Sequence, residues 1–235
     1  MRHESQPPGI FRLNTDSLEW RLRTSQISHD PVKDAIQNAL PASCTLLVRS
    51  HGKVWTGSGF HIGHGVIATA AHVAPAELKK EGFEIFATFD AQNLLPVSDI
   101  LASEENYDAA LLYCKHAEKV PVVELGDSDK LEVGDIIAVV GSPEGWHDTA
   151  TVGRVSNVHQ KLGMFAPTPA WNDIIFYDAD ILQGVSGGML IGIDGKAYGS
   201  IMGVTGMHAD IGIGENAACP SNKIRLLAQS VGLRV

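Results

Sequence analysis

From residue 44 onward, the sequence alternates between short apolar runs of the kind that form β-strands and the turn residues that separate them. Almost no helical pattern lies between these runs, which argues against the repeated strand–helix units of a parallel sheet. A sandwich or barrel of short strands is therefore the expected architecture. The runs lie at 44–50, 54–62, 65–73, 83–90, 95–101, 108–114, 135–141, 149–160, 173–182, 188–193 and 196–204.

The stretch around 115–134 divides the runs evenly and predicts two β-lobes, at about 41–120 and 130–235. Residues 1–40 then form an N-terminal arm that ends in a short helix, for which Asp30 and Pro31 supply the N-cap and first-turn proline. Residues 220–231 read as a closing helix, with Ser221 or Asn222 as its cap.

Composition and charge narrow the class of protein. The net charge of −9 argues against a nucleic-acid binder, which should present a basic face. The three cysteines are far apart and form no metal-binding pattern, so each is expected to fill an apolar position. The N-terminus has no apolar signal run and no stretch is long enough to span a membrane. A cytoplasmic protein without a membrane partner, a metal or another cofactor is the simplest interpretation.

Three separate segments carry residue types that nucleophilic catalysis needs. His72 follows an apolar run, Asp108 opens another, and Ser186 stands within Gly184–Gly188. Each alone is ordinary: a structural histidine, a turn aspartate, a glycine turn. Together they supply a hydroxyl, a base and a carboxylate that orients the base. They are 36 and 78 residues apart, which assigns His72 and Asp108 to the first lobe and Ser186 to the second.

The glycines around Ser186 allow a sharp turn that brings backbone amides close to the hydroxyl. We expect the amides of Gly184 and Ser186 to form an oxyanion hole. The same pentapeptide fits the nucleophile elbow of α/β-hydrolases. That fold requires helices between its strands and the order Ser, Asp, His, and the sequence has neither.

The sequence resembles the protease domain of the HtrA/DegP family of trypsin-like serine peptidases, in stretches that run in the family's order. LGDSDKLEVGD, within 125–145, is the most informative of them, because it carries no catalytic chemistry and would not arise by convergence on a triad. The stretches are GSGFHIGHGVIATAAHV (57–73), YDAALLY (107–113), LGDSDKLEVGDIIAVVGSPEG (125–145), TVGRVSNV (151–158), YDADILQGVSGGMLIGIDGKAYGSIMG (177–203) and PSNKI (220–224).

This resemblance implies an all-β fold of two six-stranded antiparallel barrels. It also implies a serine endopeptidase that acts through an acyl-enzyme, with His72, Asp108 and Ser186 as its triad. The alternative is a protease-like module that binds peptides or regulates a partner without cutting. In either case the expected partners are proteins or peptides. HtrA-type domains often form trimers through N-terminal elements, so residues 1–40 are expected either to do the same or to cover the cleft.

The sequence departs from the family's pattern in three places. Family members usually continue into a PDZ domain and carry an export signal or membrane anchor, and neither is expected here. Val185 stands where relatives have Asn or Asp before the nucleophile. Digestive relatives become active when a new N-terminus pairs with that aspartate. With Val185 in its place, we expect activity that does not require N-terminal cleavage.

Residues for substrate binding follow from the same comparison. In this fold the residue six positions before the serine lies at the base of the specificity pocket, and here it is Asp180. A buried carboxylate would favour Arg or Lys, whereas an apolar pocket formed by Ile181 and Leu182 would favour aliphatic residues. The alternative for Asp180 is a carboxylate turned to solvent. Ser200–Val204 is expected to pair with the substrate backbone, with Met202 lining the pocket and Gly203 leaving its mouth open.

Overall fold

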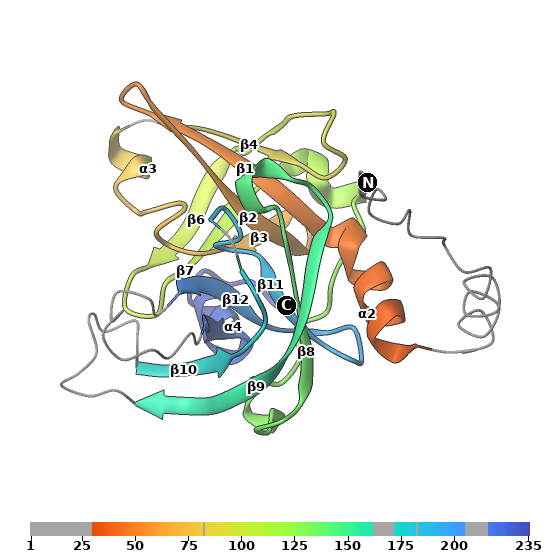
Figure 1. Cartoon of the computed structure of the whole chain (residues 1–235). Coiled ribbons are helices and arrows are strands. Elements are labelled where there is room, and N and C mark those ends of the chain that lie inside the picture. Colours follow the sequence, from red (N-terminus) through yellow and green to blue (C-terminus); the bar gives the residue numbers. More distant parts are fainter. Residues whose placement is uncertain (1–29, 82, 162–171, 182, 205–215) are drawn as a thin grey trace, which may run out of the picture. The chain divides into compact units, whose positions relative to one another are not determined.

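The computed structural model describes residues 30–81, 83–161, 172–181, 183–204 and 216–235. All of its described helices and strands belong to one compact unit that starts at Pro31. Figure 1 shows this unit coloured along the chain. Its helices are α2 (Pro31–Ala39), α3 (Leu78–Glu81) and α4 (Ser221–Ser230), with 3-10 turns η1 (Leu40–Ala42), η2 (Lys115–Lys119), η3 (Ser128–Lys130) and η4 (Pro143–Gly145).

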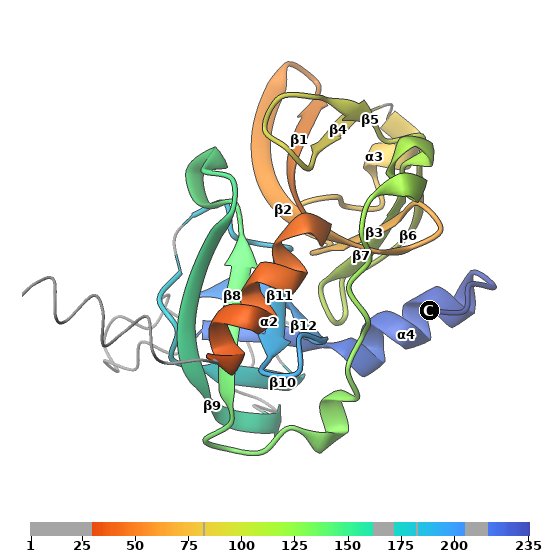
Figure 2. The same cartoon turned by 90° about the vertical axis from the view of Figure 1, so that its right-hand side faces the viewer.

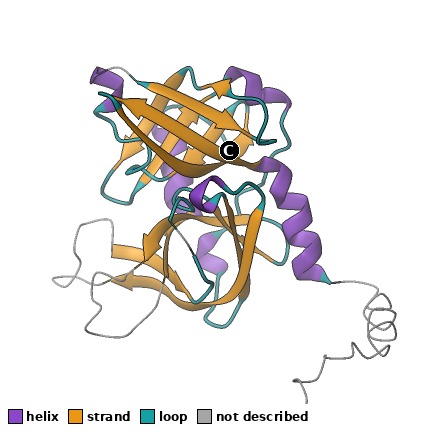
Figure 3. Ribbon diagram, turned by 45° about the horizontal axis from the view of Figure 1, so that its top comes forward, coloured by secondary structure: helices purple, strands orange, loops and turns teal. Residues whose placement is uncertain are grey.

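The strands fall into two groups, which Figure 3 shows as two bodies of orange arrows. The first group contains β1 (Ser43–Ser50), β2 (Lys53–Gly63), β3 (Val66–Thr69), β4 (Glu84–Thr88), β5 (Leu95–Pro96), β6 (Asp99–Glu104) and β7 (Ala109–Tyr113). The second contains β8 (Ile136–Gly141), β9 (Thr149–Lys161), β10 (Asn172–Tyr177), β11 (Met189–Gly192), β12 (Ala197–Val204) and β13 (Asn216–Pro220).

The first lobe is an antiparallel sheet in the order β5-β4-β1-β2-β3-β7-β6. Its inner face buries one apolar cluster that includes Leu46, Ile67 and Leu112. Seven strands replace the expected six, because the run 95–101 forms two strands, β5 and β6. The interruption follows Pro96, which has no N–H to donate to a continued ladder.

The second lobe is a closed barrel in the order β10-β13-β12-β11-β8-β9, as expected for a six-stranded barrel. Its strand β13 was not predicted from the sequence, because Asn-Ala-Ala-Cys-Pro contains none of the β-branched or aromatic residues that mark a strand. Small residues suit this position, since Ala217, Ala218 and Cys219 are all fully buried.

Helix α2 packs on strands β8 and β11 of the second lobe and buries Ala35 and Ala39 (Figure 2). The helix therefore belongs to the same compact unit as the two lobes. Among the described residues, no helix has both the length and the apolar character needed to cross a membrane. Cys44, Cys114 and Cys219 are buried free thiols, as expected for small apolar side chains.

Helix α4 lies against the segment that joins the lobes. The expectation that Ser221 or Asn222 caps it is wrong, since Pro220 occupies the N-cap position and no side chain caps the helix. The Ser221 hydroxyl instead donates to Gly126 O at 2.6 Å, and the Asn222 amide donates to Asp127 Oδ1 at 2.9 Å. The stretch that begins at Leu125, which carries no catalytic residue, therefore holds the start of α4, while the helix also packs on β7 and β12.

Candidate active site

His72 and Asp108 are in direct contact in the first lobe. His72 Nδ1 lies 2.8 Å from Asp108 Oδ2 and 3.0 Å from Oδ1, and the backbone N–H of His72 donates to Oδ1 at 2.9 Å. A carboxylate can only accept here, so Nδ1 carries the proton and Nε2 is free to accept one. The His72 side chain is 49% exposed and Asp108 only 13%, so the carboxylate is shielded while the ring is accessible.

The local fold explains why two residues 36 positions apart meet. Strands β3 and β7 are antiparallel neighbours, and Thr69, the last residue of β3, pairs with Ala110 near the start of β7. The residues that follow β3 and those that precede β7 therefore emerge at the same edge of the sheet. His72 and Asp108 occupy these places, and Asp108 turns with a left-handed φ of 52°.

Ser186 lies half-buried in the loop between β10 and β11 of the second lobe. Two glycines allow this loop to approach the first lobe. A Cβ on Gly187 would lie 3.0 Å from Ala70 N and still closer to Thr69 Oγ1, and a Cβ on Gly57 would meet both Val73 and the Ser186 carbonyl. The serine segment is thus packed against residues on both sides of His72 in the sequence.

The peptide groups around Ser186 have defined directions. Gln183 O accepts from Glu144 N at 2.8 Å, and Val185 O accepts from Gly188 N at 2.8 Å. The described chain contains no cis peptide, and in a trans peptide the N–H points opposite to the preceding C=O. The N–H groups of Gly184 and Ser186 therefore point away from these two partners.

Position 184 has no room for a side chain, so it has to be a glycine. Its φ is +94°, and an added Cβ would lie 2.7 Å from the Glu144 nitrogen. Glu144 itself has a left-handed φ of 51° in turn η4. Sequence reasoning did not single out Glu144, and its only signal was the Pro-Glu-Gly turn composition at 143–145.

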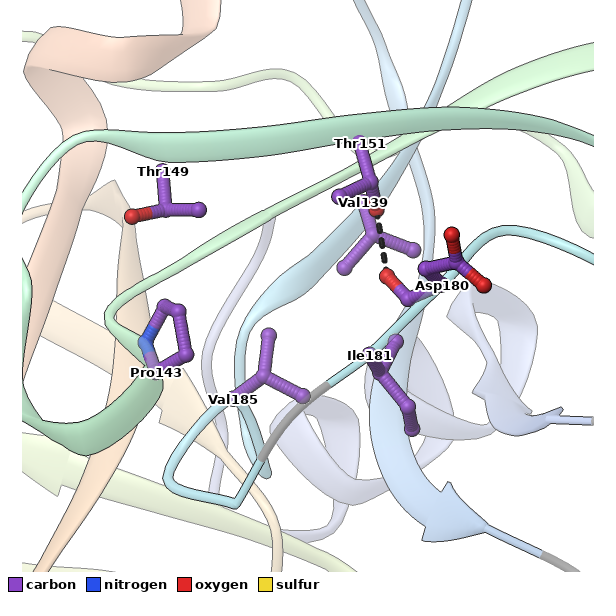
Figure 4. A pocket seen from close by; sticks show the side chains of 7 residues that line it. All are labelled: Val139, Pro143, Thr149, Thr151, Asp180, Ile181 and Val185. Atoms are coloured by element: carbon purple, nitrogen blue, oxygen red, sulfur yellow. Dashed lines mark hydrogen bonds between the residues drawn. The ribbon is translucent and has the colours of Figure 1, made fainter. Parts of the chain in front are cut away.

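A cavity of about 380 Å³ lies beside residues 183–188, which carry the predicted nucleophile Ser186 and are called the nucleophile loop below (Figure 4). Val185, only 4% exposed, points into it from the loop, opposite the barrel residues. Because residue 185 is a valine, it has no carboxylate that could pair with a newly cut N-terminus. Activity without N-terminal cleavage stays a prediction. The lining residues are Val139, Pro143, Thr149, Thr151, Asp180, Ile181 and Val185.

The residues expected to bind substrate do not all meet at this cavity. Asp180 and Ile181 line it, but Ser186, Met202 and Gly203 do not. Asp180 is exposed, with its carboxylate turned away from Pro143 and Val185, while its carbonyl accepts from Thr151 Oγ1 at 2.6 Å (Figure 4). Met202 is buried in β12, and Leu182 and the side chain of Val204 lie outside the described residues.

A two-lobed β fold with a His–Asp pair in one lobe and a glycine-flanked serine in the other is typical of trypsin-like serine peptidases. The family model of the trypsin-like peptidase domain matches residues 57–199, and the chain belongs to this family. The predicted resemblance to HtrA proteins is confirmed by the relatives and solved structures that the chain matches.

The curated relatives are HtrA and Deg proteins. Serine protease HTRA1B of Danio rerio is 30% identical over 244 residues, covering 96% of this chain and 47% of that protein. Serine protease HTRA1 of Xenopus laevis is 35% identical over 173 residues, covering 72% and 35%. The periplasmic pH-dependent serine endoprotease DegQ of Escherichia coli is 36% identical over 136 residues, covering 56% and 28%. The chain thus spans less than half of the length of each.

The solved structures confirm the fold. The HtrA-type protease AlgW with tripeptide superimposes with a TM-score of 0.72 at 23% identity, covering 85% of this chain and 63% of that one. The serine endoprotease from Yersinia pestis superimposes with a TM-score of 0.70 at 22% identity, covering 88% and 68%.

Proposed function

We propose that this protein is a serine endopeptidase that hydrolyses peptide bonds through an acyl-enzyme. The contact between His72 and Asp108 carries the proposal, because it fixes the imidazole in the tautomer that leaves Nε2 free as a base. The position of the Ser186 loop against Thr69 and Ala70 supports it. Membership of the trypsin-like peptidase family supplies the class of reaction.

In the proposed mechanism, Ser186 Oγ attacks the carbonyl carbon of the scissile bond and His72 Nε2 takes its proton. The imidazolium that forms is stabilised by the Asp108 carboxylate at 2.8 Å. The carbonyl oxygen becomes an oxyanion that accepts hydrogen bonds from the N–H groups of Gly184 and Ser186. His72 then returns the proton to the leaving amine. In the second half of the reaction His72 takes a proton from water, which attacks the acyl-enzyme, and gives it back to Ser186 Oγ as the leaving group.

A fluorophosphonate probe tests this proposal, because it phosphonylates an activated serine hydroxyl with loss of fluoride. We expect one stoichiometric adduct on the peptide that contains Ser186, and none in Ser186→Ala. Ser230→Ala, which changes an exposed helix residue, is the matched control and should label like the native protein. Folded native protein that is not labelled, yet binds peptides as well as Ser186→Ala does, would favour the non-catalytic peptide-binding alternative.

The substrate class is proposed to be unfolded or extended protein segments. Within the predicted pairing strand Ser200–Val204, Ile201 already exchanges hydrogen bonds with Gly187 and Gly188, so pairing with the substrate backbone is proposed for Met202–Val204. A peptide panel tests the side chain that precedes the cut. If Asp180 selects Arg or Lys, Asp180→Asn reduces cleavage after these residues and leaves cleavage after Val or Leu unchanged. Equal effects on both groups of peptides would show that Asp180 does not select the side chain that precedes the cut.

Assembly into trimers through residues 1–40 and a cytoplasmic location both stay predictions. Light scattering on the full chain and on a chain that starts at Asp30 tests the first. Helix α2 buries Ala35 and Ala39 against the second lobe, so a shortened chain must keep this helix. A trimeric full chain beside a monomeric shortened one assigns assembly to the residues before Asp30.

A further inference from the structure

We propose that Ser58, on strand β2, is a positioning residue for the oxyanion hole. Its hydroxyl and its backbone N–H hold two carbonyls of the nucleophile loop, which fixes the peptide groups adjacent to the amides proposed to receive the oxyanion. This inference rests on the proposed peptidase activity. Ser58 comes from the first lobe, whereas the loop that it holds belongs to the second.

All four consecutive carbonyls of the nucleophile loop have a donor. Gln183 O and Val185 O accept from the backbone of the second lobe, as described above. The two alternate carbonyls are both held by Ser58: its Oγ donates to Gly184 O at 2.8 Å, and its N–H donates to Ser186 O at 2.7 Å. Because each peptide group is planar, the bonds to Gln183 O and Val185 O orient the amides of Gly184 and Ser186 directly. The two bonds from Ser58 fix the peptide groups that follow each of these amides, so the amides have no freedom to turn.

The Ser58 hydroxyl also supports the turn that holds the first of these carbonyls. It accepts from Ser142 N at 2.8 Å while it donates its single hydrogen to Gly184 O. Ser142 lies two residues before Glu144, whose N–H holds Gln183 O. One hydroxyl therefore connects the turn that carries Glu144 to the peptide group that follows the Gly184 amide.

Ser58 is itself rigidly placed. It is fully buried, and its carbonyl accepts from the Thr69 hydroxyl at 2.7 Å. The space around its hydroxyl is tight, since a Cβ on Gly141 would lie 3.0 Å from Ser58 Oγ. A serine satisfies all of these partners, whereas an alanine would leave Gly184 O and Ser142 N buried without one.

A purely structural hydroxyl would affect stability but not the chemical step, and Ser221 provides that control. Ser221 is also fully buried, and its Oγ donates to a distant carbonyl, Gly126 O, at 2.6 Å. Gly126 lies outside the nucleophile loop. Ser58→Ala and Ser221→Ala therefore remove the same kind of hydrogen bond, one at the loop and one at helix α4.

The experiment compares the steady-state kinetics of the two variants in the full chain. We expect Ser58→Ala to lower kcat by about 10- to 100-fold, less than the loss of an oxyanion donor itself, with KM changed by less than about twofold. Ser221→Ala should leave both constants within about twofold of the native values. Thermal unfolding of both variants checks that each is folded at the assay temperature.

A second readout separates positioning from substrate binding. Ser186 Oγ adds to the carbonyl carbon of a peptide aldehyde and forms a tetrahedral hemiacetal. The former carbonyl oxygen of the aldehyde then occupies the proposed oxyanion hole. Its affinity should fall in Ser58→Ala by the same factor as kcat/KM. Binding of the corresponding peptide, measured in a Ser186→Ala background, should be unchanged by Ser58→Ala.

Equal kcat values in Ser58→Ala and Ser221→Ala would overturn the inference, as would a KM effect without a kcat effect. A native protein that shows no Ser186-dependent hydrolysis would overturn the proposed function instead. The two failures are therefore distinguishable in one set of measurements.

Discussion

The two lobes hold their parts of the candidate site in different ways. The first lobe presents His72 through side-chain contacts with Asp108 at an accessible edge of the sheet. The second lobe presents Ser186 through the main chain of its loop, with carbonyls 183–186 all accepting hydrogen bonds and Gly184 and Gly187 in left-handed conformations. The base depends on one carboxylate, whereas the nucleophile loop depends on the path of its main chain.

This difference predicts two kinds of sensitivity to substitution. An isosteric change of the side chain that orients His72 should abolish chemistry without changing the fold. A single methyl group on a glycine of the nucleophile loop should change both chemistry and fold, because the backbone there has no room to move.

Asp108→Asn should give the largest effect. The amide no longer selects the tautomer that leaves His72 Nε2 free, so kcat should fall by about 10⁴-fold while the fold is retained. Peptide hydrolysis measures kcat, and thermal unfolding shows whether the fold is retained. Asp99→Asn is the matched control, because Asp99 pairs with Lys79 on the surface of the same lobe and should lose less than about twofold in kcat. Comparable losses in both variants would contradict the assignment of Asp108.

Gly187→Ala should come second and should affect stability as well as activity. The added Cβ would collide with Thr69 Oγ1 and Ser58 O, in addition to the cost of φ = +83°. Gly195→Ala isolates the second cost, because its φ is +76° but its nearest atom is 3.9 Å away.

We expect Gly195→Ala to lose about 1–2 kcal/mol of unfolding free energy and to keep its activity. Gly187→Ala should lose more than this and should also lose fluorophosphonate labelling. Urea unfolding and labelling measure both quantities. Equal destabilisation of the two variants would show that the interlobe approach at Gly187 is not tight.

His61 should give the smallest effect, confined to acidic pH. Its Nε2 accepts from Gly65 N at 3.1 Å, and its Nδ1 lies 3.1 Å from the carbonyls of Val120 and Pro121, in the segment between the lobes. Burial lowers the pKa of this imidazole from its ordinary value of 6.5, more than its bonds to these carbonyls raise it. The unfolded chain therefore binds the proton more readily, and stability falls as pH drops below 6.5.

Urea unfolding at pH 7.5 and pH 5 measures this loss, which amounts to about 1.4 kcal/mol for each pH unit over which the unfolded chain is protonated at His61 and the folded chain is not. His61→Gln should show a smaller difference between the two pH values. His116→Gln, at an exposed position, should keep the native difference. An unchanged pH dependence in His61→Gln would assign the effect to another group.

The sequence allowed the fold class and most strands to be predicted, because alternating apolar runs and turns are local signals. It also allowed the pairing of His72 with Asp108 to be predicted from residue type and order. Strand β13 could not be predicted, since its alanines and Cys219 become strand residues only through burial in the barrel. The role of Ser58 could not be predicted either, because its partners Ser142 and Gly184 are distant in the chain.

The bond from Ser58 Oγ to Gly184 O joins positions 126 residues apart. During synthesis, every strand of the first lobe, with His72 and Asp108, leaves the ribosome before residue 184 does. The nucleophile loop then acquires two of its four anchors only when Ser58 of the first lobe reaches it. Under the proposed function, a growing or half-folded chain would hold a base without a positioned nucleophile, and it would not cut its neighbours until folding is complete.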